Sequence, residues 1–410
     1  MRDKELFSRL LGLKAPWEVT EIKVDYAKLR VDIWVEWPGG EVAPCPVCGE
    51  MFSLYDHREE RSWRHLDTMQ FRTILHCRIP RVECPTHGVK SIEVPWAEDY
   101  SRFTALFERF AIEVLLGCQS ATKAAELLKL SWDEVHEIQE RAVNRGLSRR
   151  GEEGWVHMGI DEKSFLCGHS YVTLISDLDR SRVIEVGDGR DEAAVTGMLC
   201  AMSEVQRGGI KAAAVDMWGP YLNAVNKALP DADVVHDKFH VIKHLGEAVD
   251  KVRKVENKAL VKEGIEALKG TKYLWLTNPS HWTDAQKGMF QDLKGKQLKV
   301  GRAWSIKEMF SSLWDYVDLK PVRNFFKRWY FWATHSRLNP IIAVAKTLKR
   351  HEDGILAYLK HRITNAVTEG LNSKIQQIKS AARGFRNFDH YRIAILFHCG
   401  KLDLYPHKCR

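Results

Sequence analysis

Three acidic side chains lie where metal ligands, rather than surface charges, are expected. Asp161 follows the apolar run of residues 155–160, and Asp216 follows a second apolar run at 211–215. Both runs have the length of buried strands, and carboxylates at the ends of neighbouring strands would lie side by side. Like charges that close are tolerated mainly when divalent cations neutralise them. Glu369 stands alone among mostly neutral or basic residues of the last predicted helix, which makes it the candidate third ligand.

Such a set of carboxylates predicts phosphodiester chemistry. Two Mg²⁺ or Mn²⁺ ions about 3.5 to 4 Å apart would activate a water molecule or a 3′-hydroxyl on one side and stabilise the leaving oxygen on the other. Attack by water nicks DNA, and attack by a 3′-hydroxyl joins it. His236 and Asp237 end the next predicted strand. They are secondary candidates, either orienting the metal ligands and substrate or having a hydrogen-bonded structural role.

A second group of ligands lies nearer the N-terminus. The segments CPVCG and CPTHG repeat one pattern, in which two ligands three positions apart can reach one tetrahedral ion. The predicted ligands of a structural Zn²⁺ are Cys45, Cys48, Cys84 and His87. Four protein ligands leave no open position, so this zinc would fold a small domain. Chance free cysteines are the alternative, and His76 and Cys77 are less favoured substitutes because they lie within an alternating strand.

Positive charge is concentrated near the C-terminus. Residues 320–410 contain 18 Lys and Arg against 5 Asp and Glu, whereas the rest of the chain is slightly acidic. A basic region of this kind indicates DNA as the partner, with a solvated basic face as the alternative. Its basic residues flank aromatic ones, a mixture suited to phosphate contact with stacking, although the helical spacing also fits a core. The candidate DNA contacts are Lys374, Lys379, Arg383, Arg386 and Trp218.

The elements that position these side chains change along the sequence. Alternating apolar residues at 21–37, 72–79 and 89–94 predict a β-rich N-terminal part. From residue 102 the apolar residues recur at three- and four-residue steps, which predicts helices.

Residues 120–132 have the pattern of a helix, a short turn and a second helix. Ser131 and Glu134 form a capping box at the start of that second helix. The pattern resembles a helix-turn-helix, but Glu137 and Glu140 on the second helix fit a plain helical hairpin equally well. Residues 144–154 are rich in glycine and charge and predict a linker to the next domain.

Beyond this linker, short apolar runs predict strands in the order β-β-β-α-β-α-β, which is typical of an RNase H-like fold with a mixed sheet. A long helical segment with six tryptophans follows at about 240–360, and the last helix is predicted to start near Arg362. The predicted strands lie at 155–160, 171–176, 182–186, 211–215 and 233–236.

The whole chain is therefore predicted to be a multi-domain α/β protein. An RNase H-like mixed-sheet catalytic core with a helical insertion would be preceded by a β-rich zinc-binding domain and a helical, helix-turn-helix-like domain. The predicted boundaries are 1–97 for the β-rich domain, 98–150 for the helix-turn-helix-like DNA-binding domain, 151–245 and 360–400 for the core, and 246–359 for the helical insertion.

The sequence resembles the insertion-sequence transposases of the ISL-three group, DDE transposases with an RNase H-like core. The resemblance covers nearly the whole chain and rests on CPVCG, CPTHG, GIDEKSF, AVDMWGPY, VVHDKFHVIKHL and the segment TNAVTEGLNSKIQQIKSAARGFRNFDHYRIAILF. It implies Asp161, Asp216 and Glu369 as the catalytic triad, and the interval of 153 residues before Glu369 implies an insertion. Some DDE relatives have a basic residue seven positions after the glutamate; here Gln376 stands there, with Lys374 and Lys379 as possible substitutes.

The resemblance also implies partners and a location. The expected substrates are the terminal inverted repeats of a transposon and target DNA, and synapsis of two ends implies a homodimer or a larger assembly. No apolar run is long enough to span a membrane, so a cytoplasmic protein, nucleoid-associated when bound to DNA, is expected. Two alternatives remain: a nuclease with the same core that performs no strand transfer, and a non-catalytic DNA-binding regulator.

Overall fold

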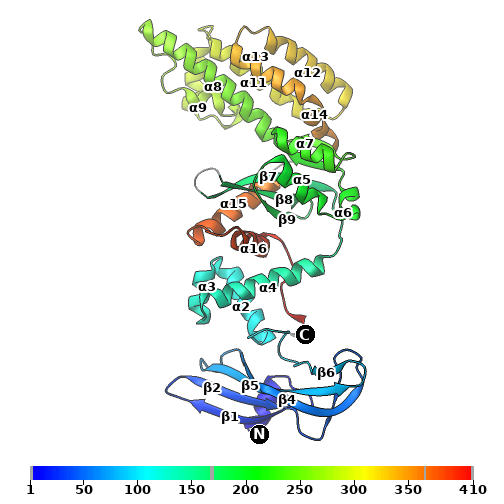
Figure 1. Ribbon diagram of the computed structural model, residues 1–410. Coiled ribbons are helices and arrows are strands. Elements are labelled where there is room, and N and C mark those ends of the chain that lie inside the picture. The colour runs from blue at the N-terminus through cyan, green and yellow to red at the C-terminus, as the bar shows by residue number, and fades with distance from the viewer. Residues whose placement is uncertain (1–2, 167–169, 364–365, 408–410) are drawn as a thin grey trace. The chain divides into compact units, whose positions relative to one another are not determined.

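The computed structural model describes residues 3–166, 170–363 and 366–407. The chain forms two compact units, and Figure 1 labels many of their elements. Unit 1 comprises Met1–Gly151, Ser380–Arg383 and Leu402–Arg410, and unit 2 comprises Glu152–Lys379 and Gly384–Lys401. None of the helices in these described ranges is long and apolar enough to cross a membrane.

Unit 1 opens with helix α1 (Asp3–Leu10) and a six-stranded sheet of order β1-β2-β5-β4-β3, in which β6 also pairs with β5. Only β2 and β5 run parallel among these pairs. Alternation along the strands buries one face, where Ile33, Trp63 and Leu75 are almost fully enclosed. The predicted β-rich part is confirmed. Its strands are β1 (Glu18–Asp25), β2 (Arg30–Glu36), β3 (Val42–Pro44), β4 (Met51–Arg64), β5 (Arg72–Cys84) and β6 (Gly88–Ser91).

Three helices complete unit 1: α2 (Ala105–Cys118), α3 (Ala121–Leu128) and α4 (Trp132–Arg150). A hydroxyl side chain caps the N-terminus of each, and the predicted capping box of Ser131 and Glu134 is present at α4. The predicted linker at 144–154 is wrong up to Arg150, because α4 continues through it. Its buried face extends through Val143 and Gly146, and two arginines in its last turn suit the negative end of the helix dipole.

A buried ion network stabilises this helical part. The Glu108 side chain on α2 is 1% exposed and contacts Arg141 and Arg145 on α4, while Arg145 also pairs with Glu98 at 2.6 Å. We expect Glu108→Ala to lower the free energy of unfolding by about 1.5–3 kcal/mol, because Arg145 and the partly exposed Arg141 would each lose one of two carboxylate partners. Denaturant unfolding checks this, and Glu113→Ala, which removes an exposed α2 carboxylate, should have little effect.

Unit 2 is built on a five-stranded mixed sheet of order β11-β10-β7-β8-β9. The first three strands form an antiparallel meander, and β10 and β11 then add parallel to β7. This is the predicted RNase H-like strand order, which the structure confirms. The strands are β7 (His157–Leu166), β8 (Ser170–Asp177), β9 (Arg182–Asp188), β10 (Ala212–Val215) and β11 (Asp233–His236).

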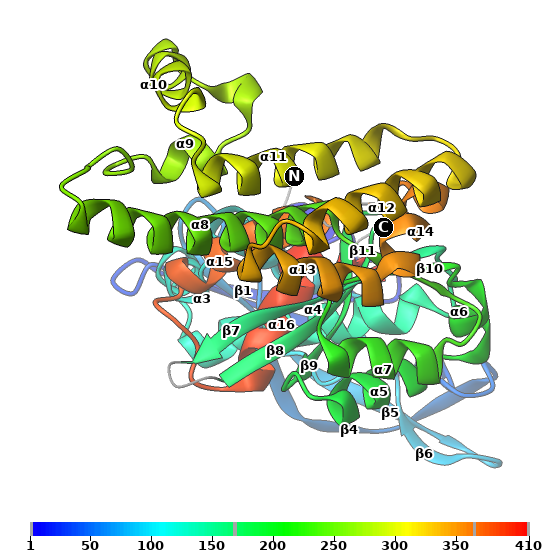
Figure 2. The same ribbon diagram turned by 90° about the horizontal axis from the view of Figure 1, so that it is seen from above.

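Helices lie on both faces of this sheet (Figure 2). The helices α5 (Glu192–Cys200), α6 (Glu204–Gly209) and α7 (Gly219–Ala228) come from the crossovers, and α5 and α7 bury Val195 and Tyr221 against Met158 and Ile160 of β7. Gly159, which lies between Met158 and Ile160 on β7, faces the other side of the sheet and approaches Thr368 of α15 (Ala366–Ala381). Helix α16 (Phe388–Cys399) follows α15. The sheet is thus covered as in an α/β core.

The helical insertion lies between β11 and α15 and has its own core. Trp275, Trp314 and Trp329 are buried in that core, and Trp282 and Trp304 pack against it. The predicted start of the last helix near Arg362 is wrong: α14 ends at His361, Arg362 adopts a left-handed conformation, and α15 begins at Ala366. The insertion helices are α8 (Lys238–Lys262), α9 (Lys272–Leu276), α10 (Asp284–Lys294), α11 (Lys299–Ser311), α12 (Leu319–Thr334), α13 (Asn339–Arg350) and α14 (Glu352–His361), with 3₁₀ turns at Pro279–His281 and Ser312–Asp315.

Candidate active site and zinc centre

The strand register of unit 2 aligns two of the candidate metal ligands. Parallel pairing places Ala212 opposite His157 and Ala214 opposite Gly159. Continued by two positions, the same register places Asp216 opposite Asp161 on neighbouring strands, which lie about 4.8 Å apart. Their carboxylates therefore share one edge of the sheet.

The position of Asp161 within its strand differs from the expectation. Asp161 was predicted to end a strand, but β7 continues to Leu166 because its outer half pairs with β8, with Asp161 opposite Leu174. Asp216 directly follows β10, as predicted. Asp161 nevertheless lies at the level where the parallel strand β10 ends, so the register still places it beside Asp216.

Helix α15 joins these carboxylates from one face of the sheet. The Asn372 side-chain amide donates a hydrogen bond of 2.6 Å to Oδ2 of Asp161, and the Lys163 ammonium donates to the Asn372 carbonyl. Glu369 lies three residues before Asn372, and residues three apart share one face of a helix. The Glu369 side chain is exposed, so it remains available to a ligand.

The electrostatics of the two aspartates differ. Burial raises the pKa of Asp161, despite hydrogen bonds from Glu162 and Asn372 that favour the charged form. Burial also acts on Asp216, but contact with His240 outweighs it and holds the pKa of Asp216 below its usual range. The His240 Nδ1 lies 3.1 Å from Asp216 Oδ1, which raises the pKa of His240. A divalent cation would offset the cost of charge on the partly buried Asp161.

The packing of α15 against β7 depends on Gly159. A Cβ atom there would lie 2.7 Å from Ser176 Oγ and 2.8 Å from Thr368 Oγ1, and Thr368 directly precedes Glu369. We expect Gly159→Ala to displace α15 and to lower DNA cleavage by about 10²-fold, the typical cost of a small misplacement of reacting groups. A gel assay of cleavage checks this.

The matched control for Gly159→Ala is Gly370→Ala, because Gly370 lies on α15 with open space around its Cβ position. Equal cleavage by the two variants would contradict the proposed contact between α15 and β7.

The secondary candidates His236 and Asp237 have different surroundings. His236 is 2% exposed, lies 3.3 Å from the Val215 carbonyl through Nδ1 and makes an edge contact with the ring of His351. A Cβ at Gly354 would lie 2.6 Å from its ring, so α14 packs directly on His236. Asp237 is buried at the start of α8, and continuing the register of β10 and β11 places it next to Asp216.

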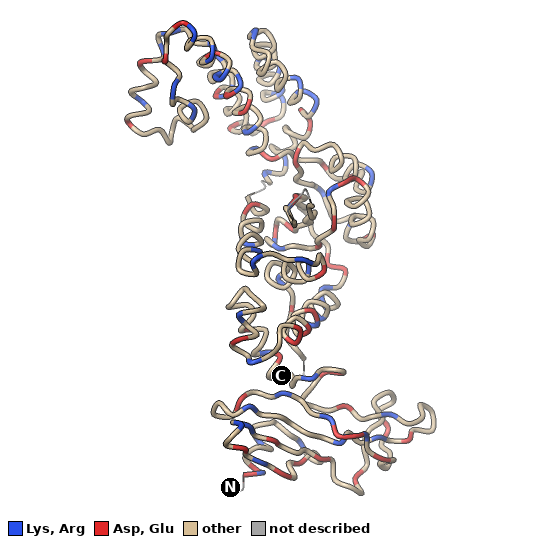
Figure 3. Tube along the Cα trace, turned by 60° about the vertical axis from the view of Figure 1, so that its left-hand side comes forward, with Lys and Arg blue, Asp and Glu red and all other residues tan. Residues whose placement is uncertain are grey.

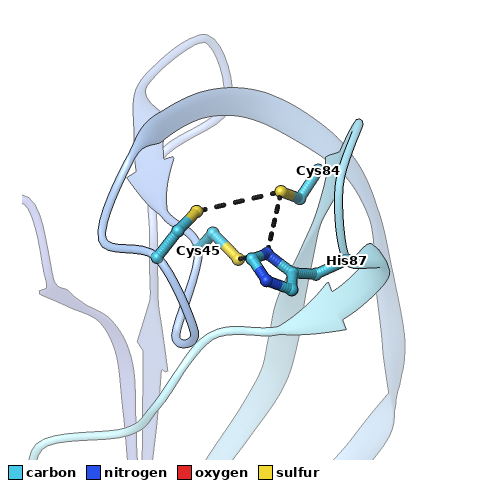
Figure 4. Close-up of side chains that lie close together, drawn as sticks. Cys45, Cys84 and His87 are labelled. Atoms are coloured by element: carbon cyan, nitrogen blue, oxygen red, sulfur yellow. Dashed lines mark hydrogen bonds between the residues drawn. The ribbon is translucent and has the colours of Figure 1, made fainter.

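The four predicted zinc ligands meet in one cluster in unit 1, and Figure 4 labels three of them, Cys45, Cys84 and His87. Their ligand atoms all lie within 4.8 Å of one another, with Cys48 Sγ 3.8 Å from Cys84 Sγ and Cys84 Sγ 3.4 Å from His87 Nδ1. Backbone N–H groups of Cys48 and Val47 lower the pKa of Cys45 to about 6, which favours a thiolate ligand. A donor set of three sulfurs and one imidazole is typical of a structural Zn²⁺ site.

His76 and Cys77, the less favoured alternative zinc ligands, have other surroundings. Cys77 is buried within β5, and burial raises the pKa of its thiol to about 12. The imidazole of His76 contacts Asp32 at 2.6 Å and Glu60 at 3.1 Å. Neither residue belongs to the cluster.

A family model described as a transposase, the DDE transposase of the ISL3 type, matches residues 158–395, which is more than half of the chain. The chain belongs to the ISL3 family of transposases. A zinc-finger model of the transposases of IS204, IS1001, IS1096 and IS1165 matches residues 41–87, and the helix-turn-helix model of transposase family ISL3 matches residues 92–143.

Curated relatives of this ISL3 transposase align over nearly their full lengths. The transposase for insertion sequence element IS1557 of Mycobacterium tuberculosis is 27% identical, and the alignment covers 94% of this chain and 93% of the relative. The transposase for insertion sequence element IS1001 of Bordetella parapertussis is 25% identical, and the alignment covers 96% of this chain and 98% of the relative. The protein is thus a DNA-transposing enzyme with a zinc finger and a helix-turn-helix.

The helix-turn-helix match decides an ambiguity of the sequence. Helices α3 and α4 are the predicted pair, and their acidic residues left DNA binding no better supported than a plain hairpin. In the structure one of these acids, Glu137, is neutralised by two arginines, Arg102 and Arg141. The family match therefore favours the DNA-binding interpretation.

The candidate DNA-binding residues of this ISL3 transposase differ in their hydrogen bonds and exposure. The Lys374 ammonium donates to the His398 carbonyl at 2.6 Å, and Lys379 donates to the Ser164 carbonyl at 2.8 Å. Arg383 and Arg386 are exposed beyond α15. Trp218 is 46% exposed at the start of α7, where the Arg190 guanidinium lies 5.6 Å from its ring centre.

Three residues near the carboxylates escaped the sequence analysis: His240, Asn372 and Lys163. His240 lies within the HDKFH segment one turn into α8, and Asn372 lies one turn after Glu369 on α15. Each lies about one helical turn after a predicted site residue, Asp237 or Glu369, and this spacing could have identified both from the sequence. Lys163 lies two positions after Asp161, on the same face of β7.

Proposed function

We propose that this transposase cuts DNA at the terminal inverted repeats of its insertion sequence and joins the ends to target DNA. In this proposal Asp161, Asp216 and Glu369 hold two Mg²⁺ or Mn²⁺ ions. Two observations carry the proposal. The register of β10 and β7, continued past Val215, places Asp216 level with Asp161, and a hydrogen bond from Asn372 ties the helix of Glu369 to Asp161.

The donor set supports this assignment. Carboxylate oxygens are the ligands that Mg²⁺ and Mn²⁺ prefer, and bound ions would neutralise charge on the transferring phosphate. Asn372 fixes one oxygen of Asp161, and His240 lies against one oxygen of Asp216, so both carboxylates are oriented before substrate arrives. Glu369 completes the set from α15.

The remaining parts are assigned to DNA recognition. The helix-turn-helix and the zinc finger would read the terminal inverted repeats, and Lys379, Arg386 and Trp218 would contact DNA near the carboxylates. A homodimer or larger assembly would bring two transposon ends together. The protein would act in the cytoplasm, on nucleoid DNA.

A gel assay tests the function. Purified protein is incubated with labelled terminal-repeat DNA, target DNA and Mg²⁺, and the products are separated under denaturing conditions. Cleaved and joined products support the transposase, cleavage without joining supports a nuclease, and binding without products supports a DNA-binding regulator.

A further inference from the structure

One exposed face of α8 carries a row of basic residues that starts at the candidate active site. At 100° per residue, positions 240, 244, 247, 251, 254, 258 and 262 fall on one stripe of this helix. The first of them, His240, contacts Asp216. The outer part of the stripe consists of Lys251, Lys254, Lys258 and Lys262, here called the lysine stripe.

The lysine stripe is available to a partner. All four side chains belong to exposed residues, and Lys254, which pairs with Asp250 at 2.9 Å, is still 66% exposed. Among the ion pairs of the described part of the chain, none involves Lys251, Lys258 or Lys262. Figure 3 marks the basic positions along the helices of unit 2. Glu247 is the acidic residue on the same face.

We propose that the lysine stripe binds the phosphate backbone of the duplex DNA that flanks the transposon end, outside the cleaved bond. This inference rests on the proposed function of the carboxylates. Lysine contacts to phosphates carry no sequence information, whereas a transposon end has a fixed sequence that a helix-turn-helix can read. The sequence of the flanking DNA differs at every insertion site, so it is best bound by lysine charges, which contact phosphates whatever the sequence.

The geometry gives the length of DNA involved. At a rise of 1.5 Å per residue, Lys251 and Lys262 lie about 16 Å and about 33 Å along α8 from His240. Duplex DNA advances about 3.4 Å per base pair, so a flank following α8 would reach the stripe about 5 base pairs from the cut and pass its end at about 10.

The test uses the full-length protein without added Mg²⁺, so that DNA binds without being cut. Terminal-repeat duplexes carry no flank or random flanks of about 5, 10 and 15 base pairs. We expect wild-type affinity to rise mainly between about 5 and 10 base pairs of flank. The triple variant Lys251→Ala, Lys258→Ala, Lys262→Ala should lose this gain, on the order of tenfold, and bind the unflanked end normally.

Salt dependence gives an independent readout. Each phosphate contact contributes about 0.9 to the slope of log K against log salt, so the triple variant should flatten the slope for flanked DNA by about 2.7. The matched control replaces Lys320, Lys327 and Lys346 with alanine, because these exposed lysines lie on α12 and α13. This control variant removes the same number of positive charges as the triple variant, but from helices other than α8.

Two results would overturn the proposal: an equal loss in the control variant, or a loss that is the same with and without flank. The second result would assign the stripe to the transposon end itself. The assay involves no catalysis, so failure of the carboxylate assignment would instead appear as cleavage by a Glu369→Gln variant.

Discussion

Replacing any one of the three carboxylates by its amide, as in Asp161→Asn, Asp216→Asn or Glu369→Gln, is expected to abolish DNA cleavage and leave DNA binding intact. An amide is isosteric but neutral and holds a divalent ion poorly. Metal ions contribute several kcal/mol of transition-state stabilisation, which corresponds to a rate loss of at least about a thousandfold. Labelled terminal-repeat DNA, analysed on denaturing gels for cleavage and on native gels for binding, measures both quantities.

Glu162→Gln is the matched control for these variants. Glu162 is the neighbour of Asp161 on β7, but alternation turns it to the opposite face of the sheet, where it pairs with Arg190 at 3.3 Å. We expect Glu162→Gln to retain most of the cleavage rate. Full activity in Glu369→Gln would remove that residue from the catalytic set, and equal losses in Glu162→Gln and Asp161→Asn would point to a general folding defect.

The candidate active site shows how far residue patterns determine a fold. Asp216 was located correctly because β10 is a short strand buried on both faces, which reads as a continuous apolar run. Beyond Asp161, β7 contains charged residues and, among the described residues, pairs with β8 alone, so periodicity gave no sign that the strand continued. Strand ends are defined by pairing partners, which one segment does not reveal.

Contacts between distant segments could not be predicted from the sequence either. The pairs Asn372 with Asp161 and His240 with Asp216 join residues that are close only in the folded chain. The glycine-rich segment after residue 144 was expected to be a linker, but tertiary packing of α4 overrides the low helix propensity of Gly146. The clustering of the four predicted zinc ligands is confirmed, because two short repeated segments each supply a pair of them locally.

The N-terminal domain should depend on its zinc ion. We expect Cys84→Ser, or removal of zinc by a chelator, to loosen the sheet of unit 1 and to weaken DNA binding. Cys45 and Cys84 are buried within the core cluster of this sheet, and without metal the bond between the two ligand segments would be lost. Structural zinc contributes about 10–16 kcal/mol of apparent binding free energy to small folded domains.

Limited proteolysis of residues 1–95, together with zinc analysis and native gels, measures this dependence. The matched control is Cys118→Ser, which changes a partly exposed cysteine of α2 outside the cluster and should retain about one zinc per chain. Unchanged protease resistance after zinc loss would show that the sheet folds by its apolar core alone. Because β5 ends at Cys84 and pairs with β2, β4 and β6, a metal bound there secures the strand that connects most of the sheet. Loss of zinc should therefore spread beyond the two ligand loops to the whole sheet.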